Sequence, residues 1–192
     1  MKRIIQIMML LAGLAASAQT GHLTFKGVPI DGTLNEFVGK LKQKGLTHLG
    51  TEQGVALLKG EFAAHKGCTI AVIAHSSGDV YRVGVALPEQ DTWLRLYNDY
   101  SSLKEMLTQK YGEPSFVIEE FQSYGSGMHD DDDTKIYNVK FDRCQYITDF
   151  TTANGTIELR IDHNEMLDCY VILIYEDTSN GDKVRSSAIE DL

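Results

Sequence analysis

Apolar residues that recur at intervals of three and four predict two amphipathic helices. The first spans residues 33–45, where Thr33 and Glu36 have the spacing of a capping box. Its apolar stripe consists of Leu34, Phe37, Val38 and Leu41. The second spans residues 92–111 and ends before Gly112. Its apolar positions are Trp93, Tyr97, Tyr100, Leu103, Leu107 and Tyr111. Because each helix has one apolar face, each must cover another element.

Short apolar runs and alternating segments predict strands after each helix. The expected strands lie at residues 55–63, 68–75, 80–87, 116–121, 136–150, 156–162 and 169–176. Asn154-Gly155 separates two alternating segments and is a strong signal for a tight hairpin. No helix is predicted between successive strands, which favours an antiparallel α+β protein over a parallel α/β protein.

The same order, one helix followed by three or four strands, occurs twice. We therefore expect two tandem helix-plus-antiparallel-sheet units, at residues 22–90 and 91–177, with the helices packed on one face of the sheet and a polar C-terminal tail at 178–192. In the second unit the helix is expected to bury its apolar face against the central hairpin. The expected contacts join Trp93, Tyr97, Leu103 and Leu107 to Ile157, Leu159 and Ile161.

The first eighteen residues have the pattern of a secretory signal peptide. Lys2 and Arg3 precede an apolar run, and Ala16-Ser17-Ala18 supplies a small-residue cleavage site. We expect cleavage after Ala18, release to the periplasm or the exterior, and no transmembrane span afterwards, because the run is shorter than a bilayer requires. Loss of two cations changes the formal net charge from −9 to −11. This acidic balance argues against a nucleic-acid partner, which would require a basic patch.

Two resemblances accompany this organisation. In its order of elements over residues 22–177, the chain resembles the β-lactamase-inhibitor-protein fold and related outer-membrane-assembly lipoprotein modules. The stretches Phe25-Lys26-Gly27-Val28-Pro29-Ile30-Asp31-Gly32 and Leu107-Thr108-Gln109-Lys110-Tyr111-Gly112-Glu113-Pro114 are similar to uncharacterised secreted proteins of gut Bacteroidetes. The resemblance implies an exported α+β protein and carries no residue roles.

A sheet with helices on one side leaves its other face open, and recognition residues are expected there. Residues 156–162 alternate between apolar and charged side chains, so one face of this strand is polar. The expected binding residues on the open face are Tyr146, Phe150, Glu158, Arg160 and Tyr170, an aromatic-plus-arginine composition typical of interfaces. The alternative is that the aromatic residues fill the joint between the two units.

The remaining candidate chemistry is weak. Asp130–Asp133 lacks the alternate spacing of a calcium loop and is interpreted as a solvated, mobile hairpin tip joining two strands. His65, Cys68 and His75 are the nearest approach to a metal cluster, but a zinc site needs a fourth ligand, and no metal or cofactor is expected. Ser126 lacks the preceding glycine of a nucleophile elbow.

Three cysteines, Cys68, Cys144 and Cys169, leave at least one thiol free. Buried free thiols are one interpretation, and a Cys144–Cys169 disulfide is the other.

The sequence therefore favours an exported, non-catalytic interaction module with a protein or cell-envelope partner. Two alternatives stay open at this point. One is a protein that binds a small ligand or an envelope polymer in a pocket between the two units, and the other is an enzyme of unrecognised type.

Overall fold

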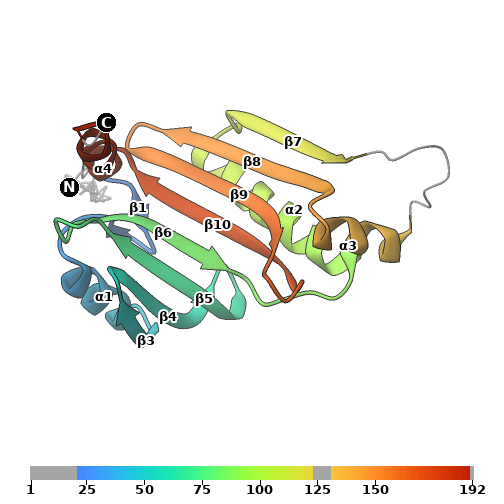
Figure 1. The fold of residues 1–192 in the computed structure, drawn as a ribbon, viewed down its shortest axis with the longest axis horizontal. Helices are drawn as coiled ribbons and strands as arrows, with labels where there is room; N and C mark the ends of the chain where they lie inside the picture. Colours follow the sequence, from blue (N-terminus) through green and yellow to red (C-terminus); the bar gives the residue numbers. More distant parts are fainter. Residues whose placement is uncertain (1–20, 123–130, 191–192) are drawn as a thin grey trace, which may run out of the picture.

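The computed structural model describes residues 21–122 and 131–190. It contains one large antiparallel sheet, one small two-stranded sheet and four helices, so the protein is α+β. The large sheet has the strand order β3-β4-β5-β6-β10-β9-β8-β7. In that order the strands are Thr47–Glu52, Val55–Phe62, His65–Ala74, Val80–Ala86, Cys169–Asp177, Gly155–His163, Cys144–Thr152 and Phe116–Phe121. Strands β3 to β6 and strands β7 to β10 thus form two meanders, which join where β6 pairs with β10 (Figure 1).

The two predicted helices are confirmed. Helix α1 covers Leu34–Gln43, and its capping box is complete: the Glu36 amide donates to Thr33 Oγ1, and Glu36 Oε2 accepts from the Thr33 amide at 3.0 Å. Helix α2 covers Trp93–Tyr111 and ends at Gly112, whose φ of 89° is a backbone conformation that glycine adopts readily. Its buried residues are Trp93, Leu96, Tyr100, Leu103 and Leu107.

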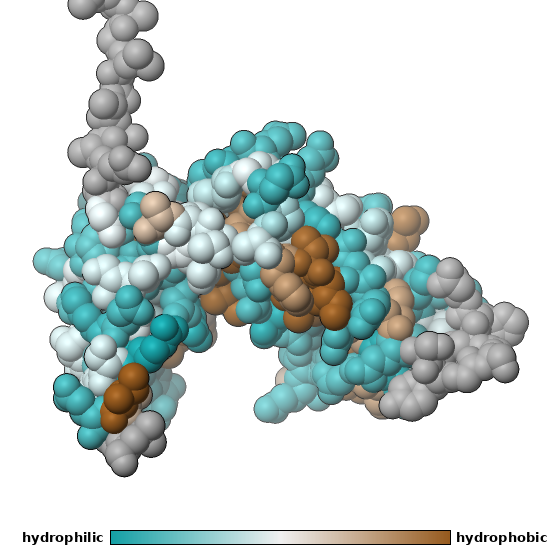
Figure 2. Space-filling view, turned by 90° about the horizontal axis from the view of Figure 1, so that it is seen from above, coloured by the Kyte–Doolittle hydropathy of each residue, from teal (hydrophilic) through white to brown (hydrophobic). Residues whose placement is uncertain are grey.

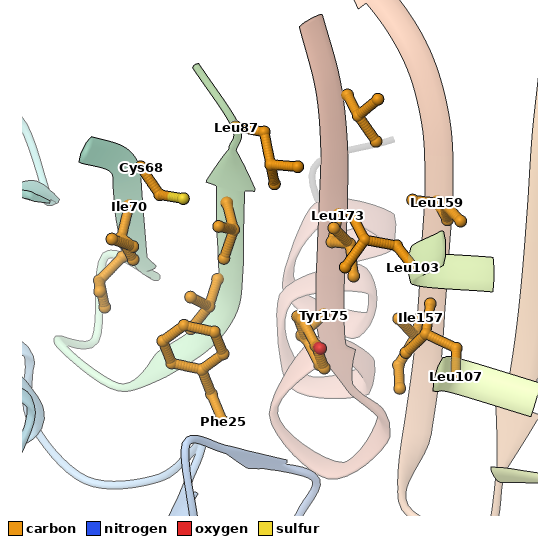
Figure 3. Close-up of a cluster of buried hydrophobic side chains, with 14 of the residues drawn as sticks. Phe25, Cys68, Ile70, Leu87, Leu103, Leu107, Ile157, Leu159, Leu173 and Tyr175 are labelled. Atoms are coloured by element: carbon orange, nitrogen blue, oxygen red, sulfur yellow. The ribbon is translucent and has the colours of Figure 1, made fainter. Parts of the chain in front are cut away.

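Helices α1 and α2 cover the same face of the large sheet. The strand residues buried on that face are cross-strand partners of one another. One buried row runs through Leu58, Ile70, Val85, Leu173 and Leu159. Figure 3 shows part of this row, with Leu103 and Leu107 of α2 lying beside Leu159 and Ile157 of β9. Tyr97 was expected in the contact face but is 38% exposed, because the helical period places Leu96 and Tyr100 over the sheet instead.

The predicted strand at 136–150 is wrong in its first half. Residues Asp132–Lys140 form helix α3, and strand β8 begins only at Cys144. Asp131 is the N-cap of α3, since its Oδ1 accepts from the Thr134 amide at 2.8 Å. Ile136 and Val139, three positions apart, are both buried. A three-residue interval is helical, and in so short a segment the sequence pattern did not distinguish it from an irregular strand.

The solvated hairpin tip expected at Asp130–Asp133 is therefore also corrected. Asp131 to Asp133 begin α3 rather than join two strands, and Asp130 lies outside the described residues. The carboxylate of Asp132 accepts from the amides of Trp93 at 3.1 Å and Leu94 at 2.8 Å. An aspartate from α3 thus caps the N-terminus of α2, where Thr92 makes no side-chain capping bond.

The polar tail expected at 178–192 is helical: α4 covers Thr178–Glu190. Buried Asp177 accepts from the Asn180 amide at 2.9 Å and acts as the N-terminal cap. The Asn180 side chain donates to the carbonyls of Ile30 and Val80, which attaches the helix to the rest of the fold. Strand β3 was not predicted, because all of its residues are exposed and it pairs only with β4.

The small sheet connects the N-terminal segment to the core. It consists of β1 (Thr24–Phe25) and β2 (Val28–Pro29). Phe25 is 1% exposed and packs against Phe62 and Tyr175, with ring centroids 5.5 and 5.4 Å away. This contact joins the N-terminal segment to β10 in the centre of the large sheet.

Candidate functional site

The candidate site is the face of the large sheet opposite α1 and α2, which we call the open face. Along β9, Ile157, Leu159 and Ile161 are buried, whereas the alternate residues Glu158 and Arg160 are partly exposed. The same alternation continues in β10. Figure 2 shows that the molecule is hollowed on the side that faces the viewer in Figure 1, where neither α1 nor α2 covers the strands.

Three of the five predicted binding residues, Glu158, Arg160 and Tyr170, lie on the open face. Arg160 and Ile172 are cross-strand partners, and so are Tyr170 and Asp162. Burial raises the pKa of the Tyr170 hydroxyl, and the charge of Asp162 raises it further, so this phenol stays protonated and able to donate.

The predicted placement of Tyr146 and Phe150 on the open face is wrong. Phe150 is 1% exposed and is the cross-strand partner of buried Ile157, so Phe150 and Ile157 lie on the covered face. Tyr146 is four positions before Phe150 and has the same orientation. Its ring lies 5.0 Å from Trp93 and 5.6 Å from Tyr100, both in α2. These aromatic side chains serve packing between α2 and β8.

The open face holds its arginine side chains in fixed positions. Arg160 donates from Nη1 to Glu158 at 2.9 Å and from Nε to Asp162 at 3.0 Å. Two strands away from β9, Arg82 of β6 donates from Nε to Glu176 of β10 at 3.0 Å. Paired in this way, each guanidinium has already lost much of its conformational entropy, so less is lost when a partner binds.

The strand register aligns one row of open-face residues across all eight strands. The row consists of Gly50, Leu57, Ala71, Gly84, Ile174, Glu158, Asp149 and Phe116. Small residues, Ala71 and Gly84, lie on two of the inner strands, whereas Leu57 on the second strand and Phe116 on the last are 43% and 51% exposed. The row is therefore recessed at Ala71 and Gly84 and apolar near both edges of the sheet.

Asp149 is a site residue that sequence reasoning did not identify. It is the cross-strand partner of Glu158, and its Oδ1 is buried with no hydrogen-bond partner. Burial raises the pKa of the Asp149 carboxyl, and the charge of Glu158 raises it further. Two adjacent carboxylates with an unsatisfied oxygen favour the approach of a cation. Alternation along β8 places Asp149 and Phe150 on opposite faces of the sheet. Without the strand register, the sequence could not identify which of these faces is open.

A pocket of about 320 Å³ lies at one edge of the open face. Tyr170 lines it together with Lys59, Thr69 and Glu89. Thr69 has Lys59 and Ala86 as its cross-strand partners, so the pocket floor is the sheet itself. A hydroxyl, an ammonium and a carboxylate group in one recess can recognise polar groups of a partner.

The other chemistry considered from the sequence is dispersed. His65 Nδ1 lies 3.8 Å from Asp99, Cys68 is fully buried, and His75 contacts Ser77 in a turn. Within the described part of the chain, no three His, Cys, Asp or Glu side chains converge as metal ligands would. The region around Ser126 lies outside the described residues.

All three cysteines are free, so the buried-thiol interpretation holds for Cys68 and Cys169, and the Cys144–Cys169 disulfide is wrong. Cys144 is only half-buried, yet burial raises the pKa of its thiol to about 12, with a further contribution from nearby Cys169. A thiol that stays protonated is a poor nucleophile.

Comparisons with protein-family models, curated proteins and solved structures found no match to this chain. Across residues 21–122 and 131–190, no helix is both long enough and apolar enough to cross a lipid bilayer.

Proposed function

We propose that the protein is an exported interaction module that binds a protein or cell-envelope partner through the open face. The observation that carries this proposal is a wide, hollowed sheet face with ion-paired arginines already in position. Exposed apolar side chains lie at its rims, and interfaces combine such apolar anchors with preorganised arginine.

The charges of the open face favour a partner that presents lysine or arginine. Arg160 lies between two carboxylates, and Asp149 adds a third, whose Oδ1 is buried without a hydrogen-bond partner. A partner cation placed between Asp149 and Glu158 would satisfy the buried oxygen and lower the repulsion between the two acids. We therefore infer a basic protein surface as the partner.

Two matched substitutions test this proposal. Leu57→Arg adds a large charged side chain to the open face, and Leu94→Arg adds the same side chain to α2, where Leu94 is 62% exposed. Wild-type protein and both variants are immobilised and exposed to envelope extract of the producing cells, and retained proteins are identified by mass spectrometry. We expect one basic protein to be retained by the wild type and by Leu94→Arg but lost from Leu57→Arg. Equal retention by the two variants would refute the assignment of the open face.

Export is the second part of the proposal and is supported by the basic, apolar and small-residue pattern before Gln19. N-terminal sequencing of protein recovered from the periplasm or the medium should begin at or near Gln19. Recovery of the chain with Met1 intact from a membrane pellet would contradict export.

We also infer that the two meanders are tandem copies of one helix-plus-sheet unit. In support, α1 precedes β3 to β6, α2 precedes β7 to β10, and the strand order reverses at the β6–β10 pair. On this order of elements we propose a likeness to the β-lactamase-inhibitor-protein fold. Separate expression of residues 22–90 and 91–177 would test this inference. If each is one copy of the same unit, the two fragments when mixed should give the circular dichroism spectrum of the native protein.

A further inference from the structure

A second recess lies on the covered face, on the opposite side of the sheet from the proposed interaction surface. It has a volume of about 180 Å³ and lies between the last turns of α2 and the turn that joins β4 to β5. Leu103 and Leu107 of α2 form one wall, Phe62 forms another, and Leu173 and Tyr175 of β10 form the floor. Figure 3 shows Leu103 of α2 beside Leu173 of β10, with Tyr175 below them on the same strand as Leu173. The recess is thus largely apolar.

The charged residues that line this recess are both lysines, in a protein of net charge −9. Lys26 donates one hydrogen bond to the carbonyl of Glu61 at 2.9 Å, which leaves two of its three N–H donors. The ammonium of Lys110 lies 4.8 Å from the ring centre of Tyr111. Both cations therefore lie where they attract an anion to the recess.

Tyr111 also lines the recess, and its hydroxyl is buried without a hydrogen-bond partner. A buried donor that stays unpaired is costly, and such groups normally have a partner. Burial and the neighbouring Tyr111 raise the pKa of Tyr175, so this second phenol keeps its proton. An acceptor such as a carboxylate oxygen would satisfy Tyr111 and interact with the two ammonium groups.

We propose that this recess binds a small monocarboxylate with an apolar group of about six carbons. The carboxylate would lie against Lys26, Lys110 and the Tyr111 hydroxyl, and the apolar group would lie against Leu103, Leu107 and Leu173. The size follows from the volume, since a dry protein cavity of about 150 Å³ accepts benzene. The proposal is independent of the open-face function, because the two sites use different residues on opposite faces.

Calorimetric titration of the full mature chain tests the ligand class with three probes of equal length: heptanoate, heptylamine and heptanol. We expect heptanoate to bind with one-to-one stoichiometry and at least tenfold more tightly than heptylamine. In the series from butanoate to heptanoate, each added methylene should increase affinity about fourfold. Absence of heptanoate binding at millimolar concentration, or equal affinity for heptanoate and heptylamine, would overturn the proposal.

Two single-group variants locate the bound carboxylate. Tyr111→Phe and Lys110→Gln should each weaken heptanoate binding at least fivefold, whereas Lys42→Gln, an exposed lysine of α1, should leave it unchanged. Tyr111→Phe should not lower the melting temperature of the ligand-free protein, because the hydroxyl it removes has no partner. Heptanoate affinity that is equal in wild type, Tyr111→Phe and Lys110→Gln would show that binding occurs elsewhere and would refute the assignment.

Discussion

The cap that α3 supplies to α2 leads to a sharp prediction for Asp132→Ala. The Asp132 carboxylate accepts from the backbone amides of Trp93 and Leu94, although it lies 39 and 38 residues away in sequence. Removing it leaves the first amides of α2 without their protein acceptor. The substitution therefore tests a tertiary contact between the two helices and not only a local helix end.

The magnitude follows from the exposure of the two bonds. The bond to Trp93 is partly buried, and the bond to Leu94 is exposed, so water can replace the second at little cost. Loss of an N-cap side chain costs about 0.5–2 kcal/mol, and bonds to a charged acceptor lie toward the upper end. We expect Asp132→Ala to lower the free energy of unfolding by about 1–2 kcal/mol.

Urea denaturation followed by tryptophan fluorescence measures this loss directly, because Trp93 is the only tryptophan in the chain and lies at the capped end of α2. Asp133→Ala is the matched control: it removes the same charge from the same first turn of α3, where Asp133 is exposed. The control should lose less than about 0.5 kcal/mol. Equal losses in the two variants would refute the capping argument.

Three further predictions concern the core, the acidic pair and the last helix. Leu103→Ala should cost about 2–5 kcal/mol in urea denaturation, because Leu103 is 2% exposed, whereas exposed Glu105→Ala should cost well under 1 kcal/mol. The raised pKa of Asp149 means that the folded state binds its proton more tightly than the unfolded state. Wild-type stability from this group therefore falls as pH rises above 3.8, and Asp149→Asn should be the more stable protein at pH 7, with the advantage disappearing in acid. Asn180→Ala should lower stability by about 2–4 kcal/mol in thermal unfolding, because it leaves two buried carbonyls unpaired.

Features that depend on neighbouring residues could be predicted from the sequence. The capping box at Thr33 and Glu36, the end of α2 at Gly112 and the alternation of β9 each follow from interactions within a few residues. The same holds for the antiparallel pairing of strands joined by short turns, such as β8 and β9 at Asn154-Gly155. The elements α1, α2 and β9 lie within one or two residues of their predicted bounds.

Other elements depended on contacts far apart in the chain. Strand β3 has no buried side chain, so it carries no hydrophobic signal and exists because β4 offers it hydrogen-bond partners. In the sequence, the start of α3 is only a run of acidic residues. In the structure, Asp131 and Asp132 each accept a hydrogen bond from a backbone amide. A carboxylate interpreted as solvated loop is in fact a structural acceptor.

The candidate sites also combine features that are local in the sequence with features that depend on distant residues. Alternation along β8 indicates that Asp149 and Phe150 face opposite ways, but only the pairing of Phe150 with Ile157 identifies which face is covered. The recess on the covered face takes residues from β1, α2 and β10, which no local pattern connects. The sequence by itself determined the positions of α1, α2 and β9, because those elements depend on local propensity and periodicity. The tertiary structure alone decided which faces are buried, because burial depends on which distant strands pair and in what register.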